Sequence, residues 1–225
     1  EQLCALIQTD EACQVPITIT NTGNFLDSFS LQISDTTGMN AEIDSQEYSL
    51  SSDQTTEEIL LNITTITDAI GLSQGNVTLD LVREDGMVIQ REVIQSTTAP
   101  YIDWKWETAE SEIDTSGRLN VVITMRNDGN IEDGLIIKMS SSYYTEMTFI
   151  PPQNAIFESE PGSIRSFEIV DCAMGENFTF RAWANIPDDQ NADGIMFLNL
   201  SAHSRLAEDT KFTYSTNSSF DAVIK

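Results

Sequence analysis

Apolar and polar residues alternate along much of the chain, and this pattern predicts β-strands. Apolar residues occupy every second position in segments 15–19 and 29–33, and the same spacing returns in 121–125 and 135–139. Side chains two positions apart lie on one face of a strand, so each segment can bury one face and leave the other in water. No segment predicts a helix of ordinary length.

A seven-residue motif lies between the paired strand segments in each half of the chain. It reads Asn-x-Gly-Asn-x-x-Asp at 21–27 and again at 127–133. Asn and Gly tolerate the left-handed backbone that a tight connection requires. The similarity extends without a gap from 15–34 to 121–140, and it therefore predicts a tandem repeat of β-domains.

Short predicted strands continue in both halves, and about seven fit in each, which is the number typical of a β-sandwich. The polar segment 96–100 ends in Pro100 and predicts the linker, because Pro cannot continue a central strand. We therefore expect an all-β protein of two tandem immunoglobulin-like antiparallel β-sandwich domains, the first over 1–98 and the second over 99–225.

The order of the turns resembles that of CARDB-type (cell-adhesion-related) immunoglobulin-like domains of bacterial and archaeal surface or secreted proteins. In both halves the repeated motif is followed by a turn before a strand, at 55–58 and 161–163. A connection that runs from Asp to Gly comes next, within 67–71 and 187–194. The resemblance covers both halves and implies a seven-stranded sandwich that serves as a spacer, adhesion or accessory module. Such domains share no catalytic residues, so it implies none here.

The chain has 36 acidic and 11 basic residues, and its net charge of −25 restricts its partners. A nucleic-acid binder needs basic residues that neutralise phosphates, so nucleic acid is excluded. An anionic membrane face would repel this surface. No apolar run reaches the roughly 18 residues of a membrane span, so we expect no direct membrane insertion. Three explanations of the acidity stay open: solubility through self-repulsion, a salt-rich habitat, and the collection of divalent cations outside the cell.

Two of the three cysteines, Cys4 and Cys13, lie close together near the start of the chain. If residues 1–8 form a strand that turns back onto the strand 15–20, the two cysteines face each other across a hairpin. A disulfide there would stabilise the fold by about 2–3 kcal/mol. Cys172 is then the odd cysteine, either buried and inert or paired with a group beyond this sequence.

The sequence contains five Asn-x-Ser/Thr motifs, which are candidate glycosylation sites. The first two lie at outward-facing positions of predicted strands. The five acceptor residues are Asn62, Asn76, Asn177, Asn199 and Asn217. Together with the expected disulfide, they predict a glycoprotein in an extracellular or cell-surface location.

One segment, Asp-Gln-Asn-Ala-Asp-Gly at 189–194, matches the first half of a calcium-binding loop. Asp189, Asn191 and Asp193 would supply ligand oxygens at alternate positions, and calcium is the one cofactor that the sequence suggests. The twelfth position is Leu200 rather than the bidentate Glu of such loops. The alternative is a longer version of the Asp-to-Gly connection of the first half, and both interpretations stay open.

The sequence does not predict an enzyme. The single histidine, His203, ends a predicted strand without a nucleophile near it in the sequence. Cys172 lacks the neighbours that would activate a thiol. Neither a phosphate-binding Gly loop nor the ligand spacing of a zinc site occurs.

Three functions stay open. The first is a non-catalytic spacer or adhesion segment of an exported or cell-surface protein, with other surface proteins or neighbouring domains of the same parent chain as partners. The second is a carbohydrate- or peptide-binding accessory module of a secreted hydrolase, for which Trp183 would be an exposed aromatic platform. The third is a subunit of an extracellular filament or surface lattice, in which the tail 219–225 adds a strand to a neighbour's sheet.

Overall fold

The structure is a computed structural model, and the part of the chain that it describes consists of strands and connections, without a helix. The described residues are 4–44, 47–157, 164–187, 194–207 and 209–220. The chain divides into two compact units, unit 1 (Glu1–Tyr101) and unit 2 (Ile102–Lys225). The predicted all-β fold class is confirmed.

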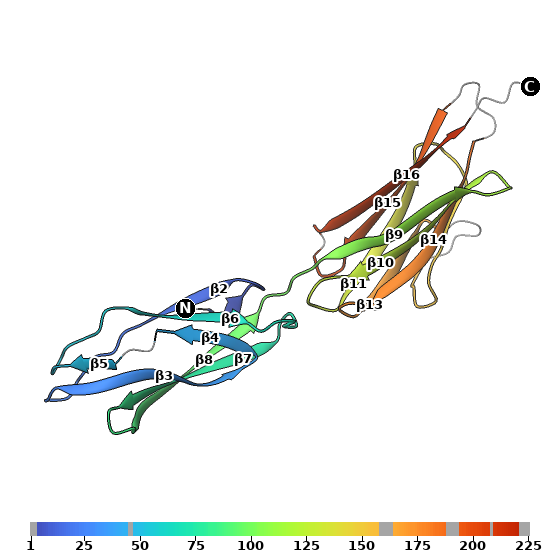
Figure 1. The fold of residues 1–225 in the computed structure, drawn as a ribbon. Coiled ribbons are helices and arrows are strands. Elements are labelled where there is room, and N and C mark those ends of the chain that lie inside the picture. Colours follow the sequence, from blue (N-terminus) through green and yellow to red (C-terminus); the bar gives the residue numbers. More distant parts are fainter. Residues whose placement is uncertain (1–3, 45–46, 158–163, 188–193, 208, 221–225) are drawn as a thin grey trace, which may run out of the picture. The chain divides into compact units, whose positions relative to one another are not determined.

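Unit 1 is a sandwich of a five-stranded and a three-stranded sheet (Figure 1). Its strands are β1 (Leu6–Ile7), β2 (Ala12–Ile17), β3 (Asp27–Thr37), β4 (Met39–Ile43), β5 (Glu47–Leu50), β6 (Ile59–Thr65), β7 (Gln74–Arg83) and β8 (Val88–Thr98). The larger sheet has the order β1-β8-β7-β3-β5 and the smaller sheet the order β2-β6-β4. Inward side chains such as Leu31, Leu61 and Val77 fill the space between the two sheets.

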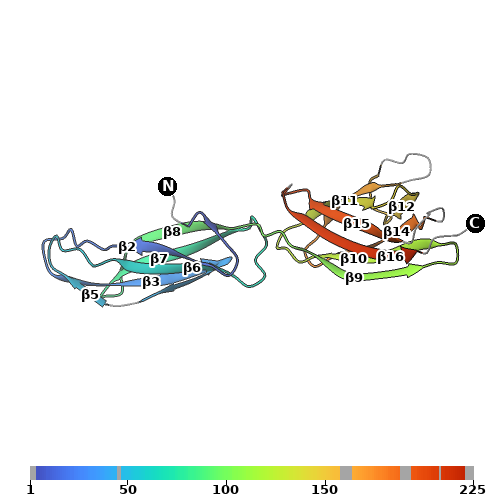
Figure 2. The ribbon, with the colours of Figure 1, turned by 90° about the horizontal axis from the view of Figure 1, so that it is seen from above.

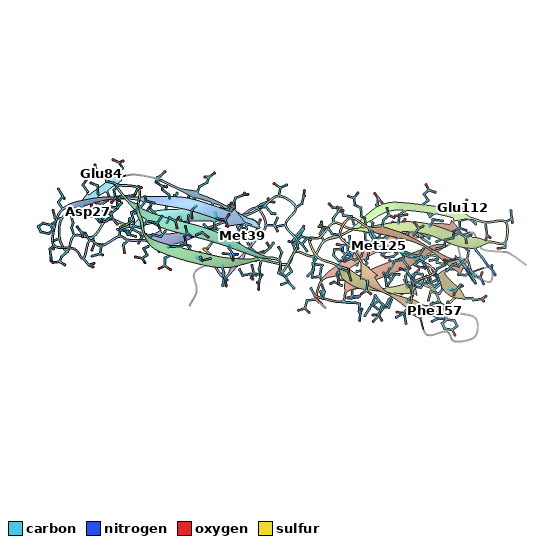
Figure 3. All side chains as sticks on the ribbon, turned by 90° about the horizontal axis from the view of Figure 1, so that it is seen from below. Asp27, Met39, Glu84, Glu112, Met125 and Phe157 are labelled. Carbon is cyan, nitrogen blue, oxygen red and sulfur yellow. A yellow bond between two sulfur atoms is a disulfide. The ribbon has the colours of Figure 1, made fainter. Side chains whose placement is uncertain are left out.

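Unit 2 is a sandwich of two four-stranded sheets. Its strands are β9 (Trp104–Ile113), β10 (Arg118–Asn127), β11 (Asp133–Ser141), β12 (Met147–Ile150), β13 (Ser166–Cys172), β14 (Asn177–Asn185), β15 (Gly194–Ser204) and β16 (Lys211–Phe220). The sheet orders are β12-β14-β10-β9 and β13-β11-β15-β16. Met125 lies among the interior side chains in Figure 3, and Phe149, Phe167 and Phe180 pack edge to face in the same core.

From the second strand onward, the two units have the same pairings. The strand before the repeated motif (β2 or β10) pairs with β6 or β14, and the strand after it (β3 or β11) pairs with β7 or β15. β4 and β12 pair with the other edge of β6 and β14, respectively. β5 and β13 pair with the other edge of β3 and β11. This division of the strands between two antiparallel sheets is that of an immunoglobulin-like sandwich.

A buried asparagine holds the repeated motif of unit 1 in place. The side-chain amide of Asn21 donates to the carbonyl oxygens of Phe25 (2.8 Å) and Leu50 (2.7 Å), and its Oδ1 accepts the N–H of Gly23 (2.9 Å). Phe25 and Gly23 belong to the motif, whereas Leu50 is the last residue of β5. One side chain therefore fixes the turn internally and ties it to the edge strand of the larger sheet.

Asn127 makes the same three bonds in unit 2. Its amide donates to Ile131 (2.9 Å) and to Cys172 (3.0 Å), the last residue of β13, and its Oδ1 accepts the N–H of Gly129 (3.0 Å). Asn21 and Asn127 are 3% and 1% exposed, so neither amide could exchange these bonds for water without opening the fold. We call Asn21 and Asn127 the clamp asparagines.

A second turn is also repeated, at 51–54 and 173–176, although its two copies share no residue pattern that would predict it. In each copy the backbone N–H of the third residue, Asp53 or Gly175, donates to the carbonyl of the clamp asparagine (2.7 Å and 2.8 Å). That third residue has a left-handed backbone in both copies, with φ of 62° and 77°. The side chain of the fourth residue accepts the first N–H of the turn (3.0 Å in both).

The predicted hairpin at the start of the chain is wrong. Leu6 and Ile7 pair in parallel with Thr97 and Thr98 of β8 instead of folding onto β2. The structure nevertheless contains the Cys4–Cys13 disulfide, with a Cα–Cα distance of 5.7 Å. Because Cys13 lies on β2, this disulfide connects the segment before β1 with the opposite sheet.

The predicted linker is also wrong in its first part. Residues 96–98 belong to β8, where Ser96 and Thr97 pair with β7 and Thr98 pairs with Ile7 of β1. Ser96 and Thr98 are buried despite their polar side chains. The predicted boundary between 98 and 99 therefore falls before the division between Tyr101 and Ile102. Earlier in the unit, β3 and β4 follow each other directly and meet at Gly38 (φ 69°).

We expect Asn127→Ala to destabilise unit 2 by about 3 kcal/mol, because two buried carbonyl groups and one N–H lose their partner. All three tryptophans lie in unit 2, at 104, 106 and 183, so urea unfolding followed by tryptophan fluorescence reports this unit. Asn21→Ala should leave the fluorescence transition in place and lower a transition seen by circular dichroism. The exposed Asn24→Ala is the control, and an equal loss in that variant would contradict the clamp.

Reduction of the Cys4–Cys13 disulfide should destabilise unit 1 by about 2–3 kcal/mol, because the unfolded chain then regains the freedom of the closed loop. Urea unfolding with and without dithiothreitol measures this effect. The fluorescence transition of unit 2 should not move, because Cys172 is a free thiol. A shift in the tryptophan signal of the same size would show that the two units do not unfold separately.

Candidate functional site

The last residue of the repeated motif in unit 2, Asp133, is the centre of a buried polar cluster. Its Oδ2 accepts bonds from Trp104 Nε1 (2.9 Å) and Ser204 Oγ (2.7 Å). Its Oδ1 accepts the backbone N–H groups of Gly134 (2.7 Å) and Leu206 (3.2 Å). Four donors compensate the carboxylate, which is 3% exposed, for the loss of water. Asp133 thereby joins β9, β11 and β15.

The corresponding residue of unit 1, Asp27, has no such surroundings. It accepts a bond from the N–H of Ser28 (2.9 Å) and is half-buried. Figure 3 shows Asp27 and Glu84 at the same end of the unit, where the N–H of Glu84 donates to the carbonyl of Ser28 (3.1 Å). The same motif therefore carries a buried structural carboxylate in one unit and a surface carboxylate in the other.

A second carboxylate of the motif, Asp128, lies between two cations at the surface of unit 2. Its Oδ1 accepts Arg126 Nε (2.5 Å), and its Oδ2 accepts Lys105 Nζ (2.5 Å). The hydrogen bond from Arg126, followed by that from Lys105, lowers the pKa of Asp128 to about 2. Both carboxylate oxygens of Asp128 are therefore occupied by side chains of the same unit.

The residues of the expected calcium site, Asp189, Asn191 and Asp193, lie outside the described residues. Calcium binding there stays a prediction. Within the ranges that the structure does describe, no group of three or more His, Cys, Asp or Glu side chains is arranged to hold a metal ion.

The two candidate reactive side chains are not brought together. His203 lies half-buried on β15, opposite Ile136 and Lys211 in the sheet. Cys172 is buried at the end of β13, with its Sγ 3.7 Å from the carbonyl oxygen of Glu176. Burial, together with nearby carboxylates, raises the pKa of this thiol to about 11. Of the two alternatives for Cys172, a buried inert thiol and a cysteine paired with a group beyond this sequence, the structure fits the first.

Trp183 faces outward as expected, but it is not a free aromatic platform. The guanidinium carbon of Arg118 lies 4.1 Å from the centroid of its ring, and the residue is half-buried. A cation over the ring stabilises this arrangement and covers one face of it. One face of the ring is therefore occupied by a side chain of the same unit.

Four of the five candidate glycosylation sites lie on strands with side chains that are partly or fully accessible. Asn62 and Asn76 are half-buried, and Asn177 and Asn199 are exposed. Asn62 accepts a bond from Gln14 (3.0 Å) and Asn199 from Ser215 (2.7 Å). Asn217 belongs to β16, and its side chain is outside the described part. Glycosylation stays a prediction at all five positions.

Comparison with protein-family models found no match, and comparison with curated proteins found none either. The resemblance to CARDB-type domains thus gains no support from them. No helix of the described residues is long and apolar enough to cross a membrane.

Solved structures with a similar course of the chain include three at 8% sequence identity. A protein of unknown function from Porphyromonas gingivalis W83 has a TM-score of 0.34, with 97% of this chain and 96% of that chain covered. A chaperone–tip adhesin complex of CFA/I fimbriae biogenesis has a TM-score of 0.28, with 94% and 95% covered. The collagen adhesin of S. aureus has a TM-score of 0.32, with 96% and 90% covered. These scores are too low to support an inference about function.

We expect Asp128→Asn to destabilise unit 2 by less than about 1 kcal/mol near pH 6, because the ion pairs lie at the surface. The pKa of Asp128 is lower in the folded state than in the unfolded state. Its contribution is therefore complete above about pH 4 and lost as the pH falls through 2. Urea unfolding followed by tryptophan fluorescence at several pH values should show the difference from the wild type vanishing near pH 2. Glu112→Gln, at the other end of β9, is the control, and a difference that stays constant with pH would contradict the assignment.

Proposed function

We propose that the chain is a non-catalytic segment of an exported or cell-surface protein, where it serves as a spacer or adhesion module. The observation that carries the proposal is the use of the repeated polar residues. The clamp asparagines Asn21 and Asn127 use their side-chain hydrogen bonds to hold the motif against an edge strand in both units. A polar motif that is repeated and used in this way suits a scaffold more than a reaction centre.

The cysteines support the location. Cys4 and Cys13 form a disulfide, and such bonds persist in oxidising compartments and are rare in the cytosol. The net charge of −25 keeps a protein soluble and repels anionic surfaces. Partners in this proposal are other surface proteins or neighbouring domains of the same parent chain, and the finer assignment to CARDB-type domains belongs to the proposal as well.

The carbohydrate-binding alternative has less support. It requires exposed aromatic platforms, and the ring of Trp183 is covered on one face by Arg118. The filament alternative depends on the tail 219–225, of which residues 221–225 lie outside the described part.

Surface location can be tested on intact cells of the source organism. Antibodies against the purified chain should bind these cells, and added protease should remove the signal before the cells lyse. A cytosolic protein of the same cells, protected until lysis, is the control. If the chain were as protected as this control, the proposed function would be wrong.

A further inference from the structure

The two units differ most at their first strand. In unit 2, β9 pairs with β10 over its whole length and lies beside β16 (Figure 2). The ring of Trp106 on β9 packs against Tyr214 on β16, with 5.9 Å between the ring centroids. Thr216 Oγ1 on β16 donates to Ser111 Oγ on β9 (3.2 Å). β9 thus closes the side of the sandwich where the two sheets would otherwise part.

The described residues of unit 1 form no strand in the corresponding position. β1 consists of Leu6 and Ile7 alone and pairs only with the last two residues of β8. Among the described residues, none pairs with Val88–Ile94 of β8 on the side away from β7. β2 is likewise the edge of its sheet and pairs only with β6. Two strand edges therefore face each other across an opening.

A cavity of ≈ 300 Å³ lies between these two edges. Its apolar lining comes from both sheets and comprises Ile17, Ile19, Leu31, Leu79, Leu81 and Ile94. In a closed sandwich such side chains are covered by a strand, as they are in unit 2 by β9. An apolar cavity beside an unpaired strand edge is the geometry in which an extended peptide adds a strand to a sheet.

The edge of β8 is the better one for pairing. The N–H of Thr97 donates to Ala5 (3.0 Å), so it points away from β7. Backbone groups alternate along a strand, and the N–H groups of Arg91 and Val93 therefore point to the same open side. β2 contains Pro16, which has no N–H to donate.

The polar lining of the cavity determines what it can accept. Glu92 pairs with Leu79, and the corresponding pair in unit 2 is Tyr214 with Leu200, so an acid replaces an inward aromatic residue. Glu92 Oε1 accepts a bond from Gln90 Nε2 (2.9 Å), and no cation pairs with it among the described residues. A carboxylate beside an apolar cavity favours a ligand that brings a positive charge. The net charge of −25 disfavours a second copy of this chain.

The cavity and the open edge of β8 together form a groove in unit 1. We propose that this groove binds an extended segment of a partner protein, which adds a strand to the open edge of β8. Apolar side chains at alternate positions of the segment enter the cavity, and a Lys or Arg among them reaches Glu92. The groove is a property of unit 1 alone, so the proposal does not depend on where the whole protein acts.

A displayed library of random dodecapeptides, selected on the immobilised full chain, tests the proposal. The enriched peptides should have apolar residues at every second position and a Lys or Arg. Val93→Pro removes an N–H of the open edge, and the side chain at this position is 53% exposed, so the substitution takes nothing from the core. The enriched peptides should bind this variant roughly tenfold more weakly or not at all. A library that yields no binder to the wild-type chain overturns the proposal.

Glu92→Lys serves as a second variant, which keeps the test decisive if Val93→Pro fails to fold. It should reverse the selection, so that Asp or Glu replaces Lys or Arg in the enriched peptides. Glu110→Lys, an exposed position on β9 of unit 2, is the matched control for the same change of charge and should leave the selection unaltered. Binding that is insensitive to both unit 1 variants overturns the proposal. Self-association of the free chain that Val93→Pro abolishes would assign the groove to a second copy and overturn it too.

Discussion

The architecture depends on one buried side-chain amide in each unit. A buried amide that lacks partners is costly, and one that makes all its bonds defines a single arrangement of the backbone around it. Asn21 and Asn127 connect the turn between the second and third strands to the end of an edge strand, β5 or β13. The second repeated turn closes onto the backbone of the same asparagine. Two segments that are distant in the sequence, the repeated motif and the edge strand with the turn that follows it, therefore meet at one residue in each unit.

The same frame carries different edges in the two units. Unit 2 closes its first edge with β9 and with aromatic contacts, and the buried carboxylate of Asp133 connects that strand to the opposite sheet. In the described part of unit 1 the first strand is only Leu6–Ile7, and a disulfide links the segment before it to the opposite sheet. A duplicated domain can change at such an edge without losing its core, because the clamp and the central strands lie elsewhere. The open edge of β8 and the cavity beside it are therefore the surface by which unit 1 differs from unit 2.

The alternation of apolar residues was enough to predict most strands and the fold class, because one face of each strand is buried. The repeated motif predicted the position of the clamp asparagines, although no pattern in the sequence showed that their amides reach β5 and β13. The second repeated turn was not predicted, because its two copies have different residues at the left-handed position, Asp53 in one and Gly175 in the other. The copies are also displaced by longer connections in the second half.

Other features depend on tertiary contacts that a local pattern does not contain. Cys4 and Cys13 suggested a hairpin because they are close in sequence, but a disulfide can also join two sheets. Ser96 and Thr98 looked like linker residues because they are polar, and they are nevertheless buried between strands. The alternation correctly predicted that Trp183 faces outward. It could not show that Arg118, which lies on another strand, covers one face of the ring.

The solvent exchange of asparagine side-chain amides, measured by nuclear magnetic resonance on the oxidised chain, tests the central claim most directly. The side-chain protons of Asn21 and Asn127 should exchange at least a hundredfold more slowly than those of the exposed Asn24, because their exchange requires opening of the fold. An opening free energy of about 3 kcal/mol already gives this factor. Exchange of either amide as fast as that of Asn24 would contradict the account.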